Sequence, residues 1–338
     1  CQLLNALLDL DHECACAGVP TTVDNNIHMI DKTPGFDSAC TEARKAVDAA
    51  YVEATCNANC IGLVKLLGMD SGFLALNTVL SSRHVDMCLL TEMEISLEKV
   101  LDHCEQLMAT KGYAVIVVAD GCGASLFRNT GEDDVDTDVG PWLRDKVMNR
   151  FKAKSKPLTV KYIDPTYMVR SVKANCYDSI YCSTLAEHAV HGSLAGYTGF
   201  VPVKSYEKFV YVPVHAVAKK IKRVNPRGRW FGRMTFTTGQ PGFEPEGFEY
   251  TEGADDDSFL DTLPPLAITN IIPEGSSICR LECAHLSEKF FSRSLATPLK
   301  ARPSFFIKPG TWTSQCLARF NSEDTSGKKY LQMIRSGP

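Results

Sequence analysis

The first 240 residues alternate between short apolar runs and longer stretches whose apolar residues recur every three or four positions. Short runs are typical of buried strands, and the longer period is typical of amphipathic helices. The pattern predicts strands at 14–17, 61–66, 85–90, 113–119, 158–163, 210–214 and 234–236. It predicts helices at 1–12, after Gly35, and at 73–80, 96–110, 139–153 and 178–194. Strand and helix alternation predicts an α/β fold, with a parallel sheet covered by helices on both faces.

The helix after Gly35 has small apolar residues at helical spacing, from Ala39 to Ala54. A stripe of small side chains predicts that this helix approaches the sheet closely.

Composition and charge narrow the possible partners. The chain has 338 residues, enough for two domains, and its net charge of -4 gives no electrostatic basis for binding nucleic acid. The basic run at 219–233 is interpreted as a solvated strand pair and turn. No apolar run reaches the length of about 20 residues that a membrane helix needs, so no membrane partner is expected.

The chain contains 14 cysteines, which are scattered through apolar segments. This pattern favours packing in a reducing compartment over disulfides, and we expect a cytoplasmic protein. The Cys279-x3-Cys283-x-His285 cluster lacks a second paired half at zinc spacing, so no metal site is assigned with confidence.

One turn places a carboxylate directly after the first expected strand. The stretch 18–26 reads Gly-Val-Pro-Thr-Thr-Val-Asp-Asn-Asn, with Asp24 near its end. In open α/β sheets, ligands bind outside the carboxyl ends of the strands. Taken alone, an Asp in a turn is more often a cap or an Asx-turn former.

Several long motifs occur in one order along the chain. They are 18–26, Phe-Asp-Ser-Ala at 36–39, Ile-Gly-Leu-Val-Lys-Leu-Leu-Gly at 61–68, Tyr-Ile-Asp-Pro-Thr-Tyr-Met-Val-Arg at 162–170, and 188–200. Together they resemble the 6-phosphofructokinase family in its plant and protist ATP-dependent branch, over residues 13–241.

The resemblance implies a phosphofructokinase-like α/β fold, with parallel sheets sandwiched by helices and two similar domains, the first truncated. The expected organisation is listed here in chain order: 1–34 as a remnant of the donor-binding domain, 35–165 as the sugar-phosphate domain, 166–242 as crossover and return elements, 243–262 as an acidic linker, and 263–338 as a tail without an assigned role.

The resemblance also implies transfer of a phosphoryl group from ATP to the 1-hydroxyl of fructose 6-phosphate, giving fructose 1,6-bisphosphate in glycolysis. Asp24 matches the general base, which takes the hydroxyl proton. Mg²⁺ would accompany ATP as the cofactor. Family members are commonly homotetramers, so a homo-oligomer is expected.

Substrate-binding residues follow from the same matches. Thr22 and Val23 would line the sugar, and Glu92 would accept hydrogen bonds from its hydroxyls. Tyr167 and Arg170 would hold the substrate, because a guanidinium fork suits the oxygens of the 6-phosphate. Taken alone, Glu92 reads as a surface acid or cap, Tyr167 as a half-buried loop aromatic, and Arg170 as a surface ion pair. Three further expected contacts fall at the family's Met-Gly-Arg, which here reads Leu67, Gly68 and Met69.

Three departures from the family pattern affect the expected activity. Asn26 stands where a second Asp helps to place magnesium, and Met69 replaces a sugar-contacting arginine. Thr21 stands at the position associated with the choice between ATP and pyrophosphate, so pyrophosphate stays open as the donor.

The family's two glycine-rich donor loops have no match in this chain and would precede residue 1. The chain alone is therefore expected to be inactive or nearly so. The alternative is a non-catalytic sugar-phosphate-binding or regulatory subunit, or an inactive fragment. A dinucleotide-binding oxidoreductase is disfavoured, since no G-x-G-x-x-G follows a strand.

Overall fold

A computed structural model describes residues 2–10, 14–130, 138–205 and 207–250. The expected tail at 263–338, most of the expected linker, and the Cys279–Cys283–His285 cluster lie outside the described residues. Within them, no helix is both long and apolar enough to cross a membrane.

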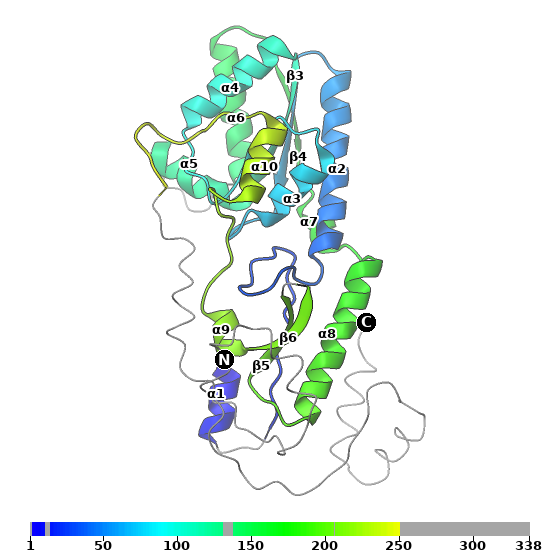
Figure 1. Cartoon of the computed structure of the whole chain (residues 1–338). Coiled ribbons are helices and arrows are strands. Elements are labelled where there is room, and N and C mark those ends of the chain that lie inside the picture. Colours follow the sequence, from blue (N-terminus) through cyan, green and yellow to red (C-terminus); the bar gives the residue numbers. More distant parts are fainter. Residues whose placement is uncertain (1, 11–13, 131–137, 206, 251–338) are drawn as a thin grey trace, which may run out of the picture. The chain divides into compact units, whose positions relative to one another are not determined.

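Four parallel strands form the main sheet in the order β2-β3-β1-β4 (Figure 1). Their bounds are β1 Cys60–Leu66, β2 Met87–Leu89, β3 Tyr113–Ala119 and β4 Thr159–Ile163. Strand β1 pairs along its whole length with β3, from Cys60↔Tyr113 to Leu66↔Ala119. Its carboxyl end therefore lies beside that of β3, and the parallel sheet expected from the sequence is confirmed.

Helices cover both faces of this sheet, as the strand and helix alternation predicted (Figure 1). Helices α2 and α3 pack together and contact the sheet, while α4 packs against β3 and α6 against β4 and β1. The helices of this region are α2 Phe36–Cys56, α3 Phe73–Ser82, α4 Leu97–Thr110, α5 Gly123–Thr130, α6 Val139–Ala153, α7 Thr166–Arg170 and α10 Arg229–Thr238, with the 3-10 turn η1 at Asp120–Cys122.

Helix α2 lies unusually close to β1, as its stripe of small residues predicted. The buried residues of the stripe include Ala43, Ala50 and Ala54. A Cβ atom added at Gly62 of β1 would lie only 2.9 Å from the carbonyl oxygen of Ala50. The close approach therefore needs a glycine on the strand as well as alanine on the helix.

A side chain covers the edge of the sheet at β2. The backbone N–H of Cys88 donates to Gln240 Oε1 at 2.7 Å, and Gln240 Nε2 donates to the carbonyl of Cys88 at 3.1 Å. The primary amide thus makes the donor and acceptor pair that another strand would make.

The remaining described elements surround a two-stranded antiparallel sheet. Strand β5 (Phe200–Ser205) pairs with β6 (Lys208–Pro213), and both contribute to a second apolar cluster. The nearby helices are α1 Gln2–Asp9, α8 Cys176–Leu194 and α9 Val214–Ala218.

Buried hydrogen bonds join α8 to α2. Asp178, which is 1% exposed, accepts hydrogen bonds from the backbone N–H and the hydroxyl of Ser38 at 2.8 and 2.5 Å. Asp178 therefore caps the first turn of α2 from another element.

Three sequence predictions of local structure were wrong. Residues 14–17 form no buried strand: Cys14 and Ala17 are exposed, and Ala17 makes a single parallel bridge to Phe200. Residues 234–236 lie in helix α10, where Met234 faces the core. The basic run at 219–233 is no strand pair, because α10 begins within it at Arg229. In each case tertiary packing overrode a short apolar or charged run.

The close contact between β1 and α2 yields a stability prediction. We expect Gly62→Ala to lower the free energy of unfolding by about 1–3 kcal/mol, since the new methyl group must displace α2. Chemical denaturation monitored by circular dichroism measures the loss. The matched control is Gly232→Ala on α10, where an added Cβ meets nothing within 4 Å. That variant should be about as stable as the unchanged chain or slightly more stable. Equal stabilities for the two variants would contradict the packing described here.

Candidate functional site

The turn that carries Asp24 is fixed by a buried asparagine. Asn25 adopts a left-handed backbone with φ of 54° and is 4% exposed. Its Oδ1 accepts from the N–H of Thr33 at 3.1 Å, and the Thr33 hydroxyl donates to the carbonyl of Thr22 at 2.7 Å. The Thr22 hydroxyl in turn accepts from the N–H of Asp24 at 3.2 Å. The backbone on both sides of Asp24 is therefore held in place.

Asp24 lies within the electrostatic reach of two charged residues from other segments. Partial burial raises the pKa of its carboxyl, the negative charge of Asp70 raises the pKa further, and the positive charge of Arg170 lowers it. The structure thus places Asp24 within reach of the charges of Arg170, which is one of the expected substrate-binding residues, and of Asp70. Asp70 was not anticipated, although it directly follows Met69, one of the expected contact residues.

Asp70 belongs to a tight loop, 68–72, that follows the carboxyl end of β1. Gly68 has a φ of 154°, and a Cβ added there would lie 3.1 Å from the carbonyl oxygen of Ser71. The carbonyl of Gly68 accepts from the N–H of Gly121 at 3.1 Å and from the hydroxyl of Thr91. The loop is therefore anchored to the segments that follow β3 and β2.

Two of the expected contact residues in this region differ in exposure. The side chain of Met69 is 69% exposed, whereas Leu67 packs partly buried against the core. Met69 therefore offers an apolar surface where the family pattern has a cation.

Glu92 cross-links two loops. Its carboxylate accepts from the N–H of Gly72 at 3.0 and 3.1 Å, and Oε1 also accepts from the N–H of Val224 at 2.7 Å. Burial raises the pKa of Glu92, and these backbone donors oppose the rise. Since a carboxylate has about four acceptor positions, the expected bonds from sugar hydroxyls would share it with backbone groups.

The remaining expected residues lie on two segments. Tyr167 and Arg170 are on α7, which packs through Val169 against the core, and the Tyr167 side chain is 81% exposed. Val23 packs against the same core. Thr22 acts through the hydrogen bonds of the Asp24 turn.

The described residues form no group of three His, Cys, Asp or Glu side chains that could hold a metal ion. Asn26, where the family has a second Asp, contributes no charge, and its carbonyl accepts from the N–H of Lys222 at 2.8 Å. The described residues therefore do not make a protein-only cage for Mg²⁺.

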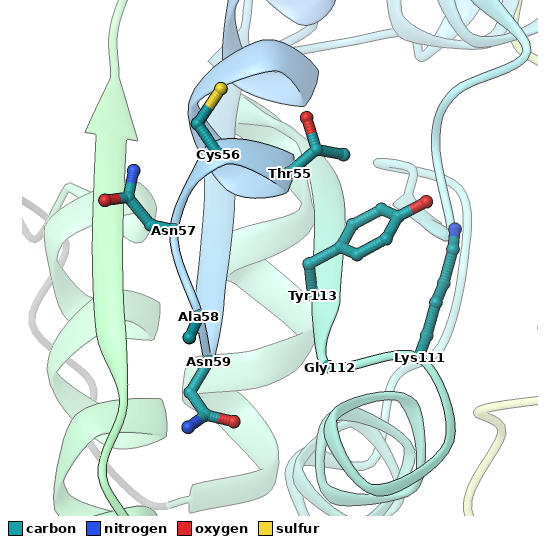
Figure 2. A pocket seen from close by; sticks show the side chains of 8 residues that line it. All are labelled: Thr55, Cys56, Asn57, Ala58, Asn59, Lys111, Gly112 and Tyr113. Atoms are coloured by element: carbon teal, nitrogen blue, oxygen red, sulfur yellow. The ribbon is translucent and has the colours of Figure 1, made fainter.

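A hollow of about 400 Å³ lies at the amino ends of β1 and β3 (Figure 2). It is lined by residues 55–59 and 111–113, which lead into the amino ends of β1 and β3. The Gly68 loop follows the opposite, carboxyl ends. Since ligands of open α/β sheets bind outside the carboxyl ends, we assign the candidate site to the Asp24 turn and not to this hollow.

The fold and the site define an open α/β protein with a carboxylate and an arginine at the carboxyl edge of its sheet. A family model described as phosphofructokinase matches residues 2–193. The chain is 42% identical over 237 residues to the chloroplastic ATP-dependent 6-phosphofructokinase 5 of Arabidopsis thaliana, covering 68% of this chain and 44% of that protein. It is 38% identical over 242 residues to an ATP-dependent 6-phosphofructokinase of Borreliella burgdorferi, covering 67% and 54%.

The chain therefore belongs to the phosphofructokinase family. It spans about half the length of the curated relatives it matches.

Solved structures agree on the fold. The chain matches a crystal structure of a pyrophosphate-dependent phosphofructokinase from Marinobacter aquaeolei with a TM-score of 0.55 and 19% identity, covering 75% of this chain and 66% of that one. It matches phosphofructokinase from Saccharomyces cerevisiae with a TM-score of 0.54 and 14% identity, covering 70% and 33%. These likenesses confirm the phosphofructokinase-like fold expected from the sequence.

The two charges around Asp24 yield opposite expected pKa changes. Asp70→Asn removes a like charge, so the pKa of Asp24 should fall. Arg170→Ala removes an opposite charge, so the pKa of Asp24 should rise. Carboxyl ¹³C NMR titration of the unchanged protein and of the two variants measures both changes in the pKa of Asp24. The control is Asp145→Asn, at an exposed residue of α6, which should leave the pKa of Asp24 unchanged. Shifts of the same sign in both site variants would contradict the arrangement.

Proposed function

We propose that this chain contributes the sugar-phosphate side of a 6-phosphofructokinase. That enzyme would transfer a phosphoryl group from ATP to the 1-hydroxyl of fructose 6-phosphate and give fructose 1,6-bisphosphate. The observation that carries the proposal is the placement of Asp24 within reach of the charge of Arg170, in a chain of the phosphofructokinase family.

Asp24 would act as the general base. Burial and the charge of Asp70 raise its pKa, and a base is more effective as its pKa approaches the working pH. The turn that holds it is braced by Asn25 and Thr33, so its carboxylate needs little reorganisation before it takes the proton of the 1-hydroxyl. As that proton passes to Asp24, the hydroxyl oxygen would attack the γ-phosphorus of ATP in line, the bond from this phosphorus to the bridging oxygen would break, and ADP would leave.

Arg170 and Tyr167 would hold the substrate. An arginine presents two parallel donors that fit a phosphate, and the exposed position of Tyr167 leaves its ring and hydroxyl free to meet a ligand. Thr22, Val23, Leu67, Gly68 and Met69 would surround the sugar, and Glu92 would accept from its hydroxyls through its remaining acceptor capacity.

ATP is the donor that the names of the curated relatives support, whereas pyrophosphate appears in the name of a structural neighbour that shares the fold. Thr21 lies exposed beside the Asp24 turn, where it could meet the donor. Mg²⁺ would neutralise the donor phosphates when bound. We further propose glycolysis as the pathway, a homo-oligomer as the assembled form, and the cytoplasm as the location.

The assigned base is tested by Asp24→Asn, which keeps the shape of the side chain but cannot take a proton. Turnover of the whole protein should fall by about 10²–10⁴-fold in a coupled assay with ATP or pyrophosphate. The control Asp145→Asn removes an equivalent charge from the exposed face of α6 and should retain turnover. Normal turnover of the Asp24→Asn variant would remove Asp24 as the base. Fructose 6-phosphate binding without turnover in the unchanged protein would instead support the regulatory-subunit alternative.

The phosphate anchor is tested by Arg170→Ala. We expect fructose 6-phosphate to bind about 10-fold or more weakly in calorimetric titration, since a charge-assisted hydrogen bond contributes about 1.5–3 kcal/mol. Arg144→Ala, at a partly exposed arginine of α6 paired with Asp145, is the matched control and should bind normally. Unchanged affinity in Arg170→Ala would exclude this arginine as the anchor.

A further inference from the structure

A nearly buried lysine lies one residue before the carboxyl end of β1. Lys65 is 9% exposed, and its Nζ lies 2.8 Å from Asp138, 2.9 Å from Asp164 and 3.7 Å from Asp120. Burial lowers the pKa of Lys65, but its bonds to Asp138 and Asp164 and the charge of Asp120 outweigh burial and raise it. Lys65 therefore stays charged at neutral pH.

The three carboxylates come from three different segments. Asp120 begins η1 directly after β3, and Asp138 caps the amino end of α6 by accepting from the N–H of Gly140 at 3.0 Å. Asp164 directly follows β4 and leads into α7. Lys65 thus ties together the segments that follow both neighbours of its own strand.

The two oxygens of Asp164 have separate partners. Oδ2 contacts Lys65, while Oδ1 accepts from the N–H of Thr166 at 3.0 Å and from its hydroxyl at 2.5 Å. Burial raises the pKa of Asp164, but the hydrogen bonds from Thr166 and Lys65 lower it overall, so the carboxylate stays ionised. One ionised side chain therefore links Lys65 to the first residue of α7.

Helix α7 depends on such an anchor because it is only five residues long, Thr166–Arg170. An isolated helix of this length is not stable in water. Val169 is its one residue buried in the core, whereas Tyr167 is 81% exposed. Helix α7 also contacts α2, but with one buried side chain it has few apolar contacts, so the link at its amino end contributes to fixing its direction.

From this chain of contacts we propose that Lys65 is a positioning residue for fructose 6-phosphate. Through Asp164 and Thr166, it holds α7 so that Tyr167 and Arg170 face the substrate. Lys65 itself does not touch the substrate. The substrate part of this inference rests on the function proposed above, whereas the anchoring of α7 does not.

Two substitutions break the link from opposite sides. Lys65→Met removes the cation and keeps a long side chain. Asp164→Asn keeps Oδ1 as the acceptor for Thr166 and replaces the oxygen that faces Lys65 with an amide, so it leaves the local cap intact. The matched control is Asp138→Asn, which takes a carboxylate from the same lysine and keeps a good N-cap for α6.

We expect Lys65→Met and Asp164→Asn each to weaken calorimetric binding of fructose 6-phosphate about 5–30-fold, with Asp138→Asn within about twofold of the unchanged protein. Because the two residues act in one chain of contacts, the Lys65→Met/Asp164→Asn double variant should lose little more than either single variant. Melting temperatures of all variants separate this effect from general destabilisation. Equal weakening in Asp138→Asn, or unchanged affinity in Asp164→Asn, would overturn the inference.

Hydrogen exchange provides a readout that needs no ligand. The N–H of Val169 donates to the carbonyl of Pro165 at 2.9 Å, and that of Ser171 to the carbonyl of Tyr167 at 3.1 Å. Both amides should exchange at least several-fold faster in Lys65→Met and Asp164→Asn, but not in Asp138→Asn. If exchange accelerates in this way but the unchanged protein does not bind fructose 6-phosphate, the proposed function is rejected and the anchoring of α7 is retained. Unchanged exchange in Lys65→Met, which still folds by its melting curve, would overturn the anchoring.

Discussion

The parallel pairing of β1 between β3 and β4 is the constraint on which the candidate site depends. Successive side chains of a strand point to opposite faces, and β1 uses both. Gly62 faces α2 and admits that helix to within contact of the backbone, while Lys65 reaches the carboxylates that follow β3 and β4. Beyond its carboxyl end, the same strand continues into the loop of Asp70. One strand therefore sets the position of a helix, an ionic cluster and part of the site.

Acidic side chains outnumber basic ones in the two charge clusters beyond the carboxyl ends of the strands. Asp24 is influenced by the charges of both Asp70 and Arg170, and three aspartates surround Lys65. Burial raises the pKa values of Asp24 and Asp120, and neighbouring carboxylates raise them further, because two carboxylates close together cannot both ionise as easily as one alone. At Asp120 the positive charge of Lys65 opposes this rise. Asp70 acts on Asp24 from a different loop, whereas Asn26 adds no charge at the position of a family carboxylate. Met69 likewise adds no charge at the position of a family arginine.

Much of the sheet could be predicted because local and global preferences agree there. Residues 113–119 and 139–153 form the strand and the helix that their apolar periods indicated, and the alanine stripe after Gly35 faces the sheet. The strands predicted at 14–17 and 234–236 were wrong, because a short apolar run does not reveal which other segments will pack against it.

The site was only partly predictable from the sequence. Motif matches pointed to Asp24 and Arg170 as site residues, but a match does not reveal a neighbouring charge such as that of Asp70. The sequence also did not reveal that two backbone amides donate to Glu92, since Gly72 and Val224 come together only in the folded chain.

Gln240 has a consequence beyond the packing of α10. Strand β2 lies at the end of the sheet, and the backbone of an uncovered end strand is a template on which a second chain could add a strand. The side-chain amide of Gln240 occupies the donor and acceptor of Cys88 on that strand. Gln240, which lies 152 positions further along the chain, therefore occupies backbone groups through which a second chain would pair. During synthesis, β2 would leave the ribosome long before Gln240. In that interval the solubility of the growing chain would depend on other contacts or on chaperones.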